Sequence, residues 1–172
     1  MVSFDVTMDI MTRSRALIAV AIILVLVETV ASLLTWPPRA PSGRPALLQG
    51  AQVDARVLAI IDRSCRDCHS ESTQYPWYSY LAPVSTLIAR DVNRGRAALN
   101  LSRWHQYPQV RRVRALTGIA NQVRDDLMPL EIYIRLHPES RLSAGEKELL
   151  FAWTQSERLR LILHESQPGG SP

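Results

Sequence analysis

Residues 64–80, SCRDCHSESTQYPWYSY, contain both cysteines of the chain. Cys65 and Cys68 lie three positions apart, and His69 directly follows the second one. This spacing is the attachment signature of c-type haem. Each thiol would add to one haem vinyl group, and the ring of His69 would bind the iron as the proximal ligand. The motif therefore predicts one covalently attached haem c per chain, with Cys65 and Cys68 as anchors and His69 as a metal ligand.

The same cysteine pair allows other interpretations. Redox-active pairs of this spacing lie in a βαβ context, and no convincing strand pattern is found here. A zinc site needs about four ligands, and only the three remaining histidines are available to complete one: His105, His137 and His164. A haem-free module stapled by a Cys65–Cys68 disulfide stays open as an alternative.

Residues 16–36, ALIAVAIILVLVETVASLLTW, are nearly all apolar and carry Glu28 as their only charge. Such a segment is long enough for a helix to cross a bilayer. Arg13 and Arg15 stand directly before it, which favours a cytoplasmic N-terminal tail over residues 1–15. Trp36 suits the far interface, where two prolines end the helix. A cleaved signal peptide ending near Ala31 is the alternative.

We therefore expect a single-pass anchor in a bacterial cytoplasmic (inner) membrane, with the rest of the chain in the periplasm. Residues 37–50, PPRAPSGRPALLQG, are rich in Pro and Gly and are predicted to be a linker. Residues 51–165 would form the folded domain, and residues 166–172 a flexible tail.

The folded domain is predicted to be all-α, because apolar residues recur at helical spacing. One stripe ends just before Cys65, a second is closed by Gly95, and a third, less regular, precedes Met128. The last helix is the clearest, because Ser143 and Glu146 form a capping box at its start. The apolar positions of the first and second stripes are Val53, Val57, Leu58 and Ile61, and Val84, Leu87, Ile88 and Val92.

Met128 is the leading candidate for the second axial ligand of the iron. It lies in DDLMPL and is the only methionine after the apolar segment. Cytochromes c usually use Met or His at this position. The order of helix, Cys-x-x-Cys-His, connecting helices, Met-Pro and final helix is that of a class I cytochrome c. His105 and His137 are the competing ligands, and a plain core methionine is the further alternative.

The chain resembles the bacterial haem-binding domain family over roughly residues 53–153. The matching motifs are a Cys-x-x-Cys-His-Ser segment, a Thr-x-x-Pro-Trp-Tyr run, a Gly-Arg-x-x-Leu-Asn run and a late Met-Pro-x-x-Tyr stretch. Here they are residues 65–70, 73–78, 95–100 and 128–133. Leu130 departs from the second proline that members often carry. The resemblance implies a haem c and an exported domain, and it does not imply a reaction.

Further residues are expected near the haem. Trp77, Tyr78 and Trp104 would supply flat walls with polar tips, although ordinary core packing explains aromatics equally well. Ligating histidines donate their second ring N–H to a carbonyl or carboxylate. In class I cytochromes c the acceptor is often a proline carbonyl, and Pro83 is the candidate here.

Single-electron transfer in the periplasm is the function that these features predict. Two protein ligands on the iron leave no site for a substrate, so we expect an electron carrier with an unidentified redox partner rather than an enzyme. A haem-based sensor or peroxidase-like protein with a labile sixth ligand is the alternative. The net charge of +4 comes from basic residues scattered among acids. No nucleic-acid-binding signature is present, so no nucleic acid is expected as a partner.

Overall fold

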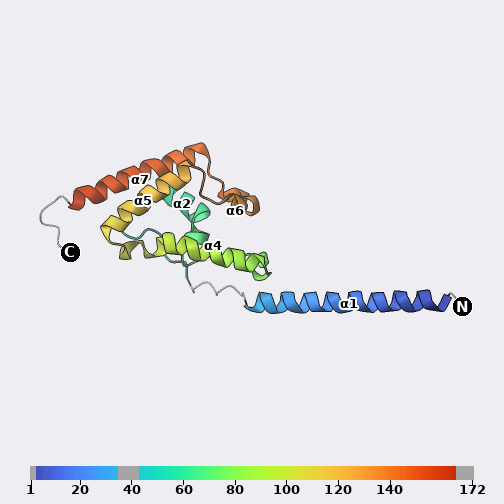
Figure 1. Ribbon diagram of the computed structural model, residues 1–172. Helices are drawn as coiled ribbons and strands as arrows, with labels where there is room; N and C mark the ends of the chain where they lie inside the picture. Colours follow the sequence, from blue (N-terminus) through green and yellow to red (C-terminus); the bar gives the residue numbers. More distant parts are fainter. Residues whose placement is uncertain (1–2, 35–42, 166–172) are drawn as a thin grey trace. The chain divides into compact units, whose positions relative to one another are not determined.

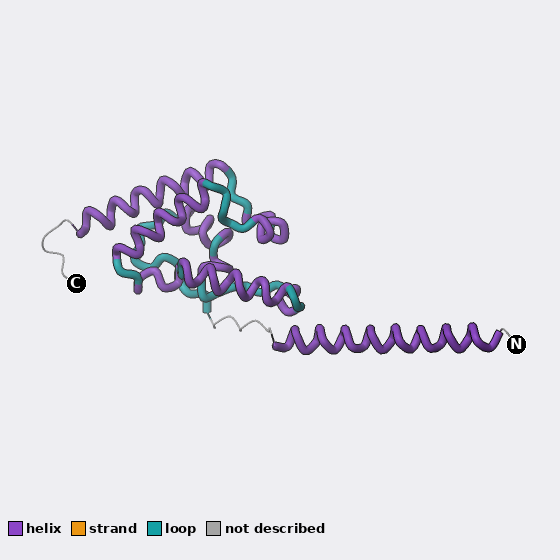
Figure 2. The backbone as a smooth tube through the Cα atoms, viewed as in Figure 1, coloured by secondary structure: helices purple, strands orange, loops and turns teal. Residues whose placement is uncertain are grey.

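The computed structural model describes residues 3–34 and 43–165, and every regular element within these ranges is a helix (Figures 1 and 2). The prediction of an all-α chain is confirmed. The chain forms two units, one made of residues 1–39 and 75–90, the other of residues 40–74 and 91–172. Each unit is described by itself below.

The first unit contains the long helix α1, Ser3–Leu34. Its part Thr12–Leu34 has a mean hydropathy of 2.8, and no part of it is buried within the protein. This is the one helix of the described residues that is long and apolar enough to cross a membrane, and a signal sequence would have the same character. The expected end of the segment at Trp36 and the following prolines lie outside the described residues.

The first unit also holds the short helix η1, Trp77–Tyr80, and the start of α4, Val84–Ala98, which continues into the second unit. The prediction that Gly95 closes this helix was wrong, because Gly95 lies inside it. A Cβ atom at this position would lie 2.5 Å from the carbonyl oxygen of Cys68. The glycine therefore serves close packing of α4 against the cysteine motif and does not end the helix.

The second unit contains the remaining helices. In chain order they are α2 (Ala55–Ser64), α3 (Arg66–His69), η2 (Leu101–Gln106), α5 (Gln109–Arg124), α6 (Glu131–Leu136), η3 (Pro138–Ser140) and α7 (Ala144–Glu165). Two of these helices have side-chain caps at their N-terminal ends. The Asp54 side chain accepts a hydrogen bond from the amide of Arg56 (2.7 Å) at the start of α2. The capping box predicted for α7 is confirmed, since the amide of Ser143 donates to Glu146 (2.8 Å) and the amide of Glu146 to Ser143 Oγ (3.3 Å).

Helices α5 and α7 pack side by side in opposite directions (Figure 1). Gln109, at the start of α5, donates to the carbonyl of Leu161 near the end of α7 (2.7 Å). Lys147, early in α7, pairs with Asp126 just after α5. Between these ends the helices bury apolar side chains such as Leu116 and Leu150, which are almost fully enclosed.

The linker predicted over residues 37–50 ends earlier than expected. Leu47 and Leu48 are buried in the same hydrophobic core, and the amide of Leu48 donates to the carbonyl of Leu101 (3.0 Å). The surrounding Pro and Gly residues are typical of a linker. Composition alone does not show that Leu47 and Leu48 within this segment pack into the core. Residues 35–42 of the predicted linker, and the predicted tail over residues 166–172, lie outside the described residues.

Candidate functional site

The cysteine motif continues the helical path of α2 into the short helix α3. The amide of Cys65 donates to Ile61 (2.9 Å), and the amide of His69 donates to Cys65 (3.0 Å). Side chains three and four positions apart share one face of a helical turn. The turn therefore brings Cys65, Cys68 and His69 to one side of the chain.

That side faces a cavity of about 680 Å³ in the second unit. This volume is in the range of sites that enclose cofactors and other small molecules. Cys65, Cys68, His69 and Met128 all line it, so the structure gathers the four residues that the motifs indicated. Much of the remaining wall is apolar and comes from Ile61, Leu99, Leu101, Ala115, Ile119 and Val123.

His69 is oriented by a contact with the backbone of the second unit. Its Nδ1 atom lies 3.0 Å from the carbonyl oxygen of Leu99, which requires the N–H form at Nδ1 and leaves Nε2 with a free lone pair. Burial lowers the pKa of His69, which favours the neutral ring that a metal requires. The prediction of Pro83 as the acceptor was wrong: the carbonyl of Pro83 accepts the amide of Leu87 (3.3 Å).

Neither Cys65 nor Cys68 forms a disulfide, and the thiol pKa of each is raised. Burial raises the pKa of Cys65 to about 12 and that of Cys68 to about 11. Metal binding by cysteine needs the thiolate, which these surroundings disfavour. Within residues 3–34 and 43–165, no group of three or more His, Cys, Asp or Glu side chains could hold a metal ion. The zinc interpretation therefore gains no support.

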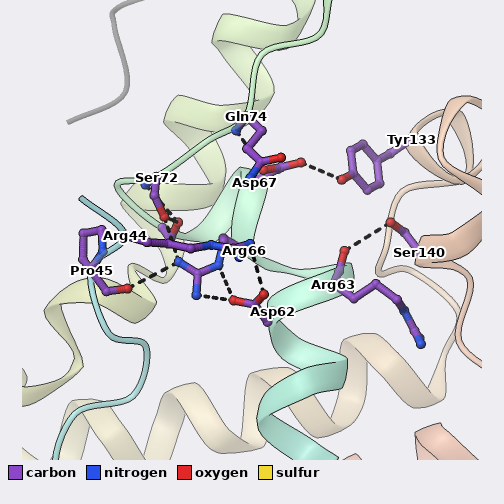
Figure 3. Close-up of polar contacts among 11 residues, drawn as sticks. Arg44, Pro45, Asp62, Arg63, Arg66, Asp67, Ser72, Gln74, Tyr133 and Ser140 are labelled. Atoms are coloured by element: carbon purple, nitrogen blue, oxygen red, sulfur yellow. Dashed lines mark hydrogen bonds and ion pairs between the residues drawn. The ribbon is translucent and has the colours of Figure 1, made fainter. Parts of the chain in front are cut away.

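Arg66, within the cysteine motif, holds the motif to its surroundings (Figure 3). Its side chain is buried and pairs with Asp62 one turn earlier in α2. It also donates to Ser72 Oγ (2.8 Å) and to the carbonyl of Pro45 (3.3 Å). Sequence reasoning missed this role, although an acid and an arginine four positions apart in a helix are a recognisable signal.

A second arginine fixes the loop that follows the motif. Arg96, from α4, donates to the carbonyl of Ser70 (2.7 Å) and to Thr73 Oγ1 (2.8 Å). Thr73 in turn donates to the carbonyl of Asp67 (2.5 Å). The segment that carries both cysteines is thereby held from α2, α4 and its own following loop, before any cofactor is considered.

Met128 lies half-buried in the turn that follows α5. Its amide and that of Leu127 both donate to the carbonyl of Gln122 (3.1 and 2.9 Å). Asp126 adopts the left-handed conformation (φ +56°), in which Asn, Asp and His are the most frequent residues besides Gly, and it pairs with Lys147 of α7. These contacts fix the backbone of the turn at the wall of the cavity.

The two competing histidines do not line the cavity. His105 is exposed on η2. The ring of His137 stacks on that of Tyr133, with centroids 4.4 Å apart, and its Nδ1 lies 3.3 Å from Glu139. Tyr133 does reach the cavity, but burial and the neighbouring Asp67 raise the pKa of its phenol. The hydroxyl of Tyr133 is engaged with Asp67 (2.9 Å), and Met128 stays the candidate ligand.

The other expected cofactor contacts are divided between the two units. Trp77 is 74% exposed, and Trp77, Tyr78 and Pro83 all belong to the first unit. Trp104 is fully buried in the hydrophobic core of the second unit and does not line the cavity. The core-packing interpretation fits Trp104, while a haem contact for Trp77 and Tyr78 stays a prediction.

Three arginines on the cavity wall were not recognised as site residues from the sequence. Arg94 of α4 and Arg111 and Arg114 of α5 are exposed and line the cavity. The guanidinium of Arg111 lies 4.0 Å from the ring centroid of Tyr107. Guanidinium groups match carboxylates in charge and geometry. An apolar cavity with thiols, a neutral imidazole and a rim of arginines fits haem, which is a flat apolar ring with propionate carboxylates at one edge.

Comparison with known proteins agrees with this geometry. Residues 22–156 match a family model described as a haem-binding domain. No curated protein and no solved structure matches the chain.

Proposed function

Because the chain belongs to the haem-binding domain family, we propose that it is a monohaem c-type cytochrome that carries single electrons. The observation that carries this proposal is the convergence of Cys65, Cys68, His69 and Met128 on one cavity of haem size. Cys65 and Cys68 would hold haem through thioether bonds. His69 would bind the iron through Nε2, while Leu99 fixes the ring through Nδ1.

Met128 would close the other axial position. Bound haem would supply a one-electron iron couple, and with two protein ligands no iron position is left open to a substrate. The chain's own contribution is to hold both ligands, to exclude water with an apolar wall and to pair the cofactor's carboxylates with arginines. This division of roles favours electron transfer over catalysis.

We also propose that α1 anchors the protein in the bacterial cytoplasmic membrane, with the second unit in the periplasm. The apolar side chains of Thr12–Leu34 are uncovered, as expected of a helix surrounded by lipid. The basic residues Arg13 and Arg15 at its N-terminal end favour a cytoplasmic start. Bacterial c-type haem is attached outside this membrane, so the topology and the cysteine motif support the same proposal.

Covalent attachment is tested first. The full chain is produced together with a c-type haem attachment system, denatured, and separated on a gel that is stained for haem. The wild-type band should stain, and Cys65→Ser or Cys68→Ser should weaken or abolish the stain because each removes one thioether. A wild-type band without stain would remove the central claim.

Optical spectra then distinguish a carrier from a sensor or peroxidase-like protein. The ferric wild type should show the weak far-red band of sulfur-to-iron charge transfer, and the ferrous form should bind carbon monoxide poorly. Met128→Ala should erase the band, open the site and lower the reduction potential. Ready carbon monoxide binding by the wild type, without the band, would favour the sensor or peroxidase-like function instead.

A further inference from the structure

The segment that carries Met128 is tied directly to the cysteine motif by one side-chain hydrogen bond. Tyr133 lies five positions after Met128, at the cavity wall, and its hydroxyl donates to Asp67 Oδ2 at 2.9 Å (Figure 3). Asp67 stands between the two cysteines. We propose that Tyr133 is a positioning residue that, through Asp67, holds Met128 at ligand distance from the iron.

Asp67 is itself held in place by hydrogen bonds, so a bond to it can restrain the Met128 segment. Its Oδ1 atom accepts the amide of Gln74 (3.0 Å), and its carbonyl accepts the hydroxyl of Thr73. The motif itself is held by Arg66 and Arg96, as described above. A segment bonded to Asp67 is therefore bonded to the most constrained part of the cavity wall.

Tyr133 is itself oriented by its neighbours. The stacked ring of His137 covers one of its faces at an interplanar angle of 22°. Ser140, a little further along, donates to the carbonyl of Arg63 (3.2 Å), so the chain after Met128 is fastened to α2 and α3 at two points. Of these two bonds, the one from Tyr133 is nearer to Met128.

Hydrogen bonds on both sides of Met128 limit its movement away from the iron. The turn is held on the preceding side by Gln122 and by the pair of the exposed Asp126 with Lys147. On the following side, the hydrogen bond from Tyr133 to Asp67 joins the segment directly to the cysteine motif. A hydrogen bond to a carboxylate is stronger than one between neutral groups, which makes this tie effective.

The inference rests on the proposed ligation by Met128, and its test uses the full chain loaded with haem. Imidazole is titrated into the ferric protein, where it competes with Met128, while the far-red band is followed. Tyr133→Phe keeps the ring but loses the bond, so the apparent dissociation constant of imidazole should fall about three- to tenfold. Asp67→Asn should cause a smaller fall, and the double variant should resemble Tyr133→Phe alone, because both changes act on one bond.

Thr154→Val is the control for loss of a buried hydroxyl. Thr154 is a fully buried residue of α7 that does not line the cavity, and its hydroxyl donates to the carbonyl of Phe151 (2.7 Å). Its replacement should lower the stability of the fold without changing imidazole competition. Equal competition in wild type and Tyr133→Phe would overturn the inference while leaving Met128 ligation intact. A wild type without the far-red band would instead refute Met128 ligation and the inference with it.

Discussion

Gly95 shows how a single residue shapes the site. It is the point at which α4 comes closest to the cysteine motif, since a Cβ atom there would also lie 3.2 Å from the Cβ atom of Cys68. The contact involves the backbone of Cys68, which is held in a hydrogen-bonded turn and cannot rotate aside as a flexible side chain would. Both α4 and the motif would have to move apart to admit even a methyl group.

Gly95→Ala should therefore lower the free energy of unfolding by about 1–3 kcal/mol, the usual cost of overpacking a tight contact. Chemical denaturation of the haem-loaded protein, followed by circular dichroism, measures this change. Gly145→Ala is the control, because no atom lies within 4 Å of the added methyl group in α7. That variant should be neutral or more stable by up to about 1 kcal/mol. Equal stability of the two variants would contradict the close approach.

At the scale of elements, the start of α7 connects the last helix to α2. Glu146 accepts the amide of Ser143 and also pairs with Arg63 at the end of α2 (2.8 Å). The hydrogen bond from Ser143 and the pair with Arg63 lower the pKa of Glu146 below its ordinary value of 4.5. A lowered pKa in the folded state means that the carboxylate stabilises the fold above pH 4.5, and that this stabilisation is lost as pH falls through the folded pKa.

Ser143→Ala should lower the free energy of unfolding by about 1 kcal/mol at neutral pH, as the loss of a helix cap does. Glu146→Gln should also destabilise the protein at pH 7, and its difference from wild type should shrink as the pH falls below 4.5. Denaturation at a series of pH values measures both effects. A difference between wild type and Glu146→Gln that stays constant down to pH 3 would show that Glu146 does not act through its charge.

At the scale of the whole molecule, the proposed function depends on which side of a membrane the chain after α1 lies. Residues 12–34 are uncovered and apolar, whereas the second unit has its own buried core. An alkaline phosphatase fusion after Gly50 should be active, because that enzyme folds only outside the cytoplasm. A fusion after Arg13 is the control and should be silent. An inactive fusion after Gly50 would contradict both export and haem attachment.

Sequence patterns sufficed for those features that depend on local chemistry. Helical periodicity, the capping box at Ser143 and the apolar run before Trp36 each arise from neighbours along the chain, so helices and a candidate span were predictable. The Cys65–His69 motif is equally local, because its spacing within one helical turn presents all three side chains on one face. The family resemblance likewise rests on short motifs of neighbouring residues.

Tertiary packing decided what depends on distant segments. The acceptor for His69 is Leu99 and not Pro83, because the carbonyl that reaches the ring is set by how the chain after α4 passes the motif. Leu47 and Leu48 are buried because residues distant in the sequence form the hydrophobic core against which they pack. The bond from Tyr133 to Asp67 joins residues 66 positions apart, and no spacing rule links them. Contacts of this kind form only when separate helices meet, which is why periodicity and motifs did not show them.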